Sequence, residues 1–333
     1  MKMFLSRFIV AMFVIALYAC STEEPKKPTP TDDNNNQSGT EVLTTSIVTY
    51  ITPTTAKSGG SQINTASGVI LSKGIVWNTS ASPTIDHFSK LAGEGYAAFV
   101  CVMTDLQPNT KYYARAYITN QNGIFYGNEV SFTTLATKGT FTDTRDGIVY
   151  NWVKIGDQIW MAENLKYLPS VVGPTTGSQT TPYYYVYGYD GTSVTAAKAT
   201  ANYTTYGVLY NWKAACNSCP AGWHLPSDAE WTELTDYLGG TSIAGCKLKE
   251  TGTTHWDSPN TGATNETGFT ALPGGYRNDN GTVSSIGVYG AWWSATEDDA
   301  TNAWYRNMGY SYSNVLRNYY YKELGFSVRC VRD

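Results

Sequence analysis

The chain has 333 residues, of which 42% are hydrophobic, and a formal net charge of −4. This length predicts two or three domains, and the acidic balance argues against a nucleic-acid-binding protein, which would carry a basic patch. Glycine and tyrosine are abundant, with 31 and 26 residues, while stretches of helical periodicity are few. Together these features predict a β-rich protein with many turns.

A short apolar segment opens the chain. Residues 8–17 are apolar and follow the basic residues Lys2 and Arg7. The run is too short to span a bilayer, which favours a signal peptide over residues 1–20. Its end, Leu-Tyr-Ala-Cys, resembles a bacterial lipobox and predicts lipidation of Cys20. The next four residues, Ser-Thr-Glu-Glu, resemble the surface-export signal of Bacteroidetes lipoproteins. We therefore expect an outer-membrane lipoprotein exposed at the cell surface.

Residues 21–40 differ in composition from the rest of the chain. They are rich in Pro, Thr, Asp and Asn and contain no aliphatic side chain. Such a segment cannot bury enough apolar surface to fold. We predict a disordered tether that holds the following domains away from the membrane.

A first domain is expected over residues 41–135. Short strand-like runs recur there between Gly, Pro and Asn turns, a spacing typical of a β-sandwich. Leu106, Pro108 and Tyr112 resemble the start of strand F in a fibronectin type III domain, where the tyrosine forms a corner. Tyr112, Ala114, Ala116 and Ile118 are predicted to share one face of this strand. We interpret the domain as a spacer, joined by a linker at 136–140 to a second domain at 141–333.

One helix of the second domain can be placed from its ends. Ser227 and Glu230 form a capping box, and Gly239-Gly240 terminates the helix. Trp231, Leu234 and Leu238 fall on one face and are expected to be core. Further along, Phe326, Val328 and Cys330 alternate with Ser327, Arg329 and Val331, which predicts a final strand with one face toward a core.

Several motifs of this domain resemble the Fibrobacter succinogenes major paralogous domain. They are Met-Ala-Glu-Asn-Leu at 161–165, Cys-Pro-Ala-Gly-Trp-His-Leu-Pro-Ser at 219–227, Phe-Thr-Ala-Leu-Pro-Gly-Gly-Tyr-Arg at 269–277, Trp-Trp-Ser at 292–294 and Gly-Phe-Ser-Val-Arg-Cys-Val at 325–331. The resemblance implies a C-type-lectin-like fold in a surface protein. The predicted fold class is therefore mainly β, with an α+β C-terminal domain. A Tyr-rich insert near 170–205 and Cys216 depart from the family pattern.

The domain contains four cysteines, and an exported domain forms disulfides by default. Four cysteines allow three pairings. The resemblance to C-type-lectin-like domains implies Cys219–Cys330, which leaves Cys216–Cys246 as the second pair. The alternative is a zinc site formed by Cys216 and Cys219 with His224, His255 or Cys246, but the usual second close pair of ligands is missing. We predict no metal and no cofactor; the acidic run 297–299 leaves calcium binding open.

The stretch from Asn302 to Tyr321 has the composition of a binding surface. Twelve of its twenty residues are Asn, Ser or Tyr. Tyrosine gives rigid amphipathic contact, and Asn and Ser give adaptable hydrogen bonds. A fixed sheet surface is the alternative. The predicted ligand-binding residues are Tyr305, Asn307, Tyr310, Tyr312, Asn314, Asn318 and Tyr320. Residues 183–189 are expected to join this surface.

These features predict a surface-displayed binding protein whose partner is an extracellular glycan or protein. We expect no enzyme activity, because no Ser/His/Asp grouping or carboxylate pair stands out. Two alternatives are kept: a structural component such as a fimbrial tip or surface-layer adhesin, and an oxidase like the formylglycine-generating enzymes, whose tail the segment 325–331 resembles. Single changes at adenines convert Asn codons to Tyr or Ser codons, so 302–321 also resembles a target of diversity-generating retroelements.

Overall fold

The computed structural model describes residues 43–63 and 68–333. The predicted signal peptide, the lipidation site Cys20 and the tether at 21–40 lie outside the described residues. The chain forms two compact units. The first ends at Phe132 and the second runs from Thr133 to Asp333, with the short segments 50–56 and 104–111 belonging to the second. Within the described ranges, none of the helices has the length and apolar character needed to cross a membrane.

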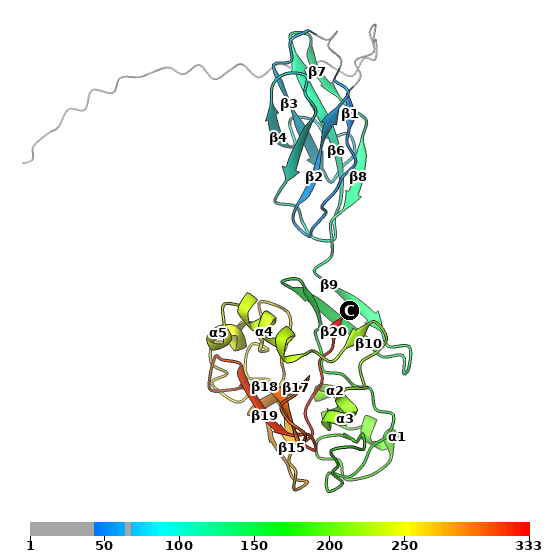
Figure 1. Cartoon of the computed structure of the whole chain (residues 1–333), viewed down its shortest axis with the longest axis vertical. Coiled ribbons are helices and arrows are strands. Elements are labelled where there is room, and N and C mark those ends of the chain that lie inside the picture. Colours follow the sequence, from blue (N-terminus) through cyan, green and yellow to red (C-terminus); the bar gives the residue numbers. More distant parts are fainter. Residues whose placement is uncertain (1–42, 64–67) are drawn as a thin grey trace, which may run out of the picture. The chain divides into compact units, whose positions relative to one another are not determined.

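The first unit consists of two antiparallel sheets (Figure 1). One sheet has the order β1-β2-β5 and the other the order β4-β3-β6-β7, with β8 also paired to β6. The strands are β1 Thr44–Thr45, β2 Ala56–Ser61, β3 Ser72–Asn78, β4 Phe88–Gly93, β5 Phe99–Met103, β6 Lys111–Asn120, β7 Gly123–Tyr126 and β8 Val130–Thr133. Leu43, Ile70 and Ile118 share one core cluster, against which Phe99 packs. The unit is thus built as a sandwich, as predicted.

Strand β6 has the alternation that the sequence predicts. Tyr112, Ala114, Ala116 and Ile118 are all buried. The Tyr112 ring stacks on Phe132 with 5.7 Å between centroids. Tyr117, on the other face, is buried as well, so the alternation identifies the face toward the core but does not mean that the other face is open.

The second unit contains two five-stranded sheets and a two-stranded one (Figure 1). Their orders are β14-β20-β11-β10-β9, β16-β15-β17-β18-β19 and β12-β13. The strands are β9 Lys138–Thr142, β10 Val149–Ile155, β11 Gln158–Met161, β12 Tyr184–Tyr185, β13 Leu209–Tyr210, β14 Trp223–His224, β15 Gly274–Arg277, β16 Val283–Ile286, β17 Tyr289–Glu297, β18 Asn302–Gly309, β19 Leu316–Tyr321 and β20 Val331–Arg332. The helices are α1 Val194–Lys198, α2 Ala201–Tyr206, α3 Trp212–Ala215, α4 Asp228–Tyr237 and α5 Thr241–Leu248. Strand β9 begins inside the segment predicted as a linker.

Helix α4 has the capping box that the sequence predicts. Ser227 Oγ accepts a hydrogen bond from the Glu230 amide, and the Glu230 carboxylate accepts one from the Ser227 amide. Trp231, Leu234 and Leu238 are buried, and the Trp231 ring lies 4.7 Å from that of Trp160. The helix stops at two glycines with positive φ, 98° and 99°, a conformation that side chains with a Cβ avoid.

Strand β17 separates two hydrophobic cores. Its neighbouring tryptophans point to opposite faces: Trp292 joins the core under α4, and Trp293 joins the core that contains Phe326. Alternate side chains of a strand face opposite sides of the sheet. Because both tryptophans are fully buried, both faces of the sheet are covered at this strand.

The last segment differs from the predicted strand. Residues 324–331 are buried on every side, and regular pairing is confined to β20 at Val331–Arg332. The face expected to be polar and exposed, with Ser327 and Arg329, is buried because these side chains form hydrogen bonds inside the protein. The Ser327 hydroxyl accepts a hydrogen bond from Asn164, and Arg329 donates to main-chain carbonyls.

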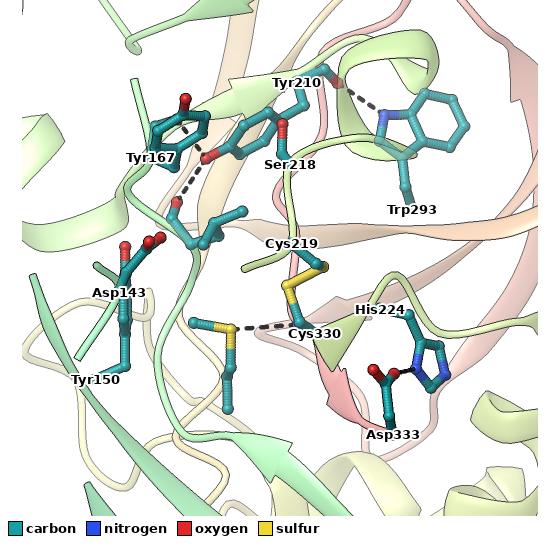
Figure 2. Close-up of a disulfide and its surroundings, with 12 residues drawn as sticks. Asp143, Tyr150, Tyr167, Tyr210, Ser218, Cys219, His224, Trp293, Cys330 and Asp333 are labelled. Atoms are coloured by element: carbon teal, nitrogen blue, oxygen red, sulfur yellow. Dashed lines mark hydrogen bonds and ion pairs between the residues drawn. A yellow bond between two sulfur atoms is a disulfide. The ribbon is translucent and has the colours of Figure 1, made fainter. Parts of the chain in front are cut away.

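The predicted disulfide Cys219–Cys330 is present, with 5.9 Å between the Cα atoms. Figure 2 shows the bridge between the segment before β14 and the segment before β20. The Cys330 amide donates a hydrogen bond to the Met161 sulfur at 3.4 Å. The predicted second pair is wrong. Cys216 and Cys246 are free thiols, because Cys216 follows α3 whereas Cys246 lies in α5 against Gly262.

The Tyr-rich insert also becomes part of the fold. Tyr185 and Val186 are buried in it, and the Tyr185 hydroxyl donates to the Thr176 carbonyl at 2.7 Å. The Arg277 guanidinium lies 4.8 Å from the centre of the Tyr185 ring. The middle of the 183–189 segment is therefore interior structure and gives no contact surface.

The bridge should stabilise the second unit. Replacing Cys219 and Cys330 together by alanine should lower the free energy of unfolding by about 2–5 kcal/mol, measured by chemical denaturation. Cys216→Ser is the matched control, since this thiol is free and exposed, and should change stability by about 0.5 kcal/mol or less. Free thiols at both bridge positions in the purified protein would contradict the assignment.

His224 should make stability depend on pH. Burial lowers the pKa of His224, but hydrogen bonds with Asp333 at 2.6 Å and Glu230 at 2.8 Å outweigh it, so the pKa is raised (Figure 2). A raised folded pKa stabilises the protein fully below the unfolded value of about 6.5, and this stabilisation is lost as pH rises through the folded pKa. Thermal unfolding between about pH 6 and about pH 9 should show this decline. Asp333→Asn should shrink it; an unchanged profile in that variant would refute the assignment.

Candidate functional site

Strands β18 and β19 form the antiparallel pair at one edge of their sheet. The register places Tyr305 opposite Asn318 and Ala303 opposite Tyr320. Opposed residues in a sheet share a face, so the predicted residues Tyr305, Asn318 and Tyr320 lie on one side together. All six residues of β19 are exposed. This face of the edge strand is open to a ligand.

A pocket of about 240 Å³ lies on this face. Its floor is apolar, with Ala291, Leu324 and Phe326 all buried. Its walls are mostly tyrosines and asparagines from four neighbouring strands and the loops next to them. The full lining is Tyr276, Asn278, Tyr289, Ala291, Tyr305, Asn307, Tyr312, Leu316, Tyr320, Leu324 and Phe326.

The tyrosines of the pocket are fixed by contacts with one another and with the floor. The Tyr305 ring lies 4.6 Å from that of Phe326 and 6.3 Å, edge-on, from that of Trp293. Tyr312 donates a hydrogen bond to Asn307 Oδ1 at 3.1 Å. A Cβ on Gly309 would lie 2.4 Å from the Tyr312 ring. Glycine at the end of β18 therefore lets Tyr312 fold back over the strand.

The pKa values of two tyrosines of the pocket, Tyr305 and Tyr312, are raised, so both hydroxyls stay protonated. Burial raises the pKa of Tyr305, and the neighbouring Tyr276 and Tyr320 raise it further. Burial also raises the pKa of Tyr312, with Tyr289 acting in the same direction. Each of the two can thus serve as a hydrogen-bond donor and acceptor.

The predicted residues divide into two groups. Tyr305, Asn307, Tyr312 and Tyr320 line the pocket, and Asn318 lies beside Tyr305 on the same face. Tyr310 instead packs against the core beneath α4. Asn314 lies at α5, where its main-chain carbonyl is 2.5 Å from the position of a Cβ on Gly245. Neither of these two lines the pocket.

Other lining residues were missed at the sequence level. Tyr276 and Tyr289 come from β15 and β17, outside the stretch of Asn, Ser and Tyr that predicts the binding surface. Phe326 was assigned to the core, correctly, but it also forms the floor. Tyr289 and Ala291 lie two positions apart, which indicates that they share one face of a strand. This spacing does not indicate which other strands that face packs against.

The opposite face of β18 and β19 is fastened to α4. The Arg306 guanidinium donates to Asp228 at 2.7 Å, and Arg317 donates to the same carboxylate at 3.0 Å. Burial acts to raise the pKa of Asp228, but the hydrogen bonds from Arg317 and Arg306 outweigh it and the pKa is lowered. Arg317 also lies over the Trp304 ring at 3.3 Å. These ion pairs therefore anchor β18 and β19 to α4 on the face opposite the pocket.

Comparison with known families identifies the second unit. The Fibrobacter succinogenes major domain matches residues 153–332. The chain belongs to this family. The matched range includes every strand of the sheet that carries the pocket. A comparison with curated proteins finds no match.

Solved structures show partial likenesses. The chain is similar to the sensor domain of an anti-sigma factor from Pseudobacteroides cellulosolvens, with 21% identity over 28% of this chain and 93% of that one and a TM-score of 0.22. It is similar to a fibronectin type III domain of human collagen XX, with 18% identity over 32% and 100% and a TM-score of 0.24. A domain of human fibronectin type III domain containing protein 3 gives 19% identity over 31% and 93%, with a TM-score of 0.22.

Several motif residues of this Fibrobacter succinogenes major domain form buried hydrogen bonds beneath the pocket. Asn164 Oδ1 accepts hydrogen bonds from Trp292 at 2.9 Å and from Arg329 at 3.1 Å, and its amide nitrogen donates to Ser327 at 3.2 Å. Trp293 donates to the Tyr210 carbonyl at 2.8 Å (Figure 2). These contacts fix β17 and the segment 324–330, which together supply the floor of the pocket.

Proposed function

We propose that this protein is a binding protein that takes an extracellular ligand in the pocket of its second unit. The observation that supports the proposal most is the convergence of five tyrosines and two asparagines over an apolar floor. A concave site with apolar walls and a few placed polar groups is the usual form of a ligand pocket. We assign this unit a C-type-lectin-like fold, as its family resemblance implies.

The proposed function is non-catalytic. The pocket lining includes no histidine, cysteine or carboxylate. His224 uses both ring nitrogens for Asp333 and Glu230, and His255 Nδ1 contacts Glu250. An oxidase of the formylglycine-generating kind would need a redox-active cysteine pair, yet Cys330 is fully buried in its bridge with Cys219. A general acid or base must lie within hydrogen-bond reach of the reacting group, and the pocket offers only tyrosine hydroxyls.

The remaining parts of the chain would display this site. We propose that Cys20 carries the lipid, that residues 21–40 form the tether and that the first unit acts as a fibronectin type III-like spacer. A structural role, as an adhesin component in a surface assembly, is the second candidate. It is favoured by the exposed edge strand β19, because an open edge can pair with another strand.

The anchor can be tested on the mature protein. Mass spectrometry of the N-terminal peptide from native membranes should find Cys20 as the first residue, with acyl chains attached. Cys20→Ala should release the protein from the membrane fraction, whereas Cys216→Ser should leave it there. A mature N-terminus elsewhere, without lipid, would contradict the proposed display.

The binding face can be tested with two adjacent tyrosines of β19. Tyr320 lines the pocket, while Tyr319 packs on Trp304 on the other face. Both are about half exposed, at 45% and 54%, so replacing either with alanine should change stability by about 0.5 kcal/mol or less. Tyr320→Ala should weaken binding to ligands found on glycan and protein arrays by more than about 1 kcal/mol. Tyr319→Ala should not; equal losses in both variants would place the site elsewhere.

A further inference from the structure

The pocket carries no charge. Its lining, drawn from residues 276–326, consists of tyrosine, asparagine, alanine, leucine and phenylalanine. A charged group entering such a site would lose hydration and gain no ionic partner, which is costly. The lining therefore favours an uncharged ligand over an anionic or cationic one.

The size of the pocket limits the ligand to one ring. Its volume of about 240 Å³ is below the roughly 300–1,000 Å³ of sites that enclose drug-sized molecules. The Phe326 ring is itself buried, packed against Trp293 at 4.4 Å and Tyr305 at 4.6 Å, and Tyr276 lies edge-on to it at 6.1 Å. An apolar floor with aromatic sides suits the C–H face of a saturated ring, and further rings would extend over exposed β19.

The polar groups of the pocket can both donate and accept. The Tyr312 hydroxyl donates a hydrogen bond to Asn307 Oδ1, and a phenol oxygen that donates can also accept one from a ligand hydroxyl. Asn307 Nδ2 lies 3.5 Å from the Gly290 carbonyl, at the long limit of a hydrogen bond, so it can donate to a ligand. A purely apolar ligand would use none of the remaining hydrogen-bonding capacity of Tyr312 and Asn307. A ring that bears hydroxyl groups would pair with them, because a hydroxyl also donates and accepts.

Metal ligands do not contribute to this arrangement. Across residues 43–63 and 68–333, no group of three or more His, Cys, Asp or Glu side chains is placed to hold a metal ion. The acidic run at 297–299 lies outside the pocket lining, and Asp299 is hydrogen-bonded to Thr301 and Asn302. Recognition in the pocket would therefore proceed through hydroxyl and amide groups alone.

Resting on the proposed binding function, we infer that the pocket binds a single neutral sugar ring, the terminal unit of an uncharged glycan, without a metal ion. The C–H face of the sugar lies toward the apolar floor formed by Ala291, Leu324 and Phe326. Its hydroxyl groups exchange hydrogen bonds with Tyr305, Tyr312 and Asn307. Tyr320 closes the side next to β19.

The experiment uses the soluble chain without residues 1–20 and follows its amide signals by NMR. The probes are the methyl glycosides of glucose, galactose, mannose and N-acetylglucosamine. Methyl glucuronide and N-acetylneuraminic acid are the charged counterparts. At least one neutral probe should shift signals of the pocket residues and bind at least about fivefold tighter than either charged probe. Addition of EDTA should leave the binding unchanged.

Two conservative variants separate a role in binding from a role in folding. Tyr312→Phe removes one hydroxyl and should weaken binding of the neutral probe by at least about fivefold, the scale of one hydrogen bond. Tyr319→Phe, on the opposite face of the sheet, is the matched control and should bind as the unchanged protein does. Both variants should keep the amide spectrum of the folded chain.

The outcomes distinguish this inference from the proposed function. Equal or tighter binding of the charged probes, loss of binding with EDTA, or no binding of any neutral glycoside would overturn the sugar inference. If a protein ligand from the arrays is lost in Tyr320→Ala while no glycoside binds, the binding function stands and the sugar inference fails. If Tyr320→Ala changes the binding of no ligand, both fail.

Discussion

The second unit depends on one buried cation. The Arg329 guanidinium is fully buried and donates to Asn164 Oδ1 and to the carbonyls of Phe269 and Thr270. Burial lowers the pKa of Arg329 to about 9, and Glu163 only partly opposes this effect. A buried charge is costly unless its donors are satisfied. The three acceptors must therefore be in place together, which fixes three distant segments of the chain at one point.

The hydrogen bonds of Arg329 also fix the conformation of the segments that they join. Thr270 has a φ of +54°, which is costly for a β-branched residue and persists only where surrounding contacts hold it. Asn265 and Arg329 supply those contacts. Asn164 in turn fixes Trp292 on one face of β17, while Trp293 is fixed on the other. The two cores thus share a single strand, and the floor of the pocket belongs to that shared structure.

The pocket combines this rigid support with an open rim. Arg306, Arg317 and Asp228 secure the strands from behind, while β19 remains exposed in front. A site held by packed side chains keeps its geometry. Substitutions on the exposed face of β19 change few core contacts, so the rim can vary while the fold is kept. The Tyr, Asn and Ser composition of 302–321 is compatible with such variation, whether or not a retroelement produces it.

The sequence by itself determined the features that depend on near neighbours. The capping box of α4, the glycines that end it and the buried alternation in β6 follow from residues a few positions apart. The disulfide came from the family resemblance, and the composition of 302–321 identified Tyr305, Asn307, Tyr312 and Tyr320 as one surface.

Only the tertiary structure decided the rest. The alternation of 325–331 predicts a half-exposed strand, yet its polar side is buried because Asn164, 165 positions before Arg329, supplies a partner. Tyr310 and Asn314 have the same composition signal as Tyr312, but the fold directs them toward the core and α5. Tyr276, Tyr289 and Phe326 reach the pocket from other strands. Which side chains converge there depends on strand order and register, and those are set by contacts between residues far apart in the sequence.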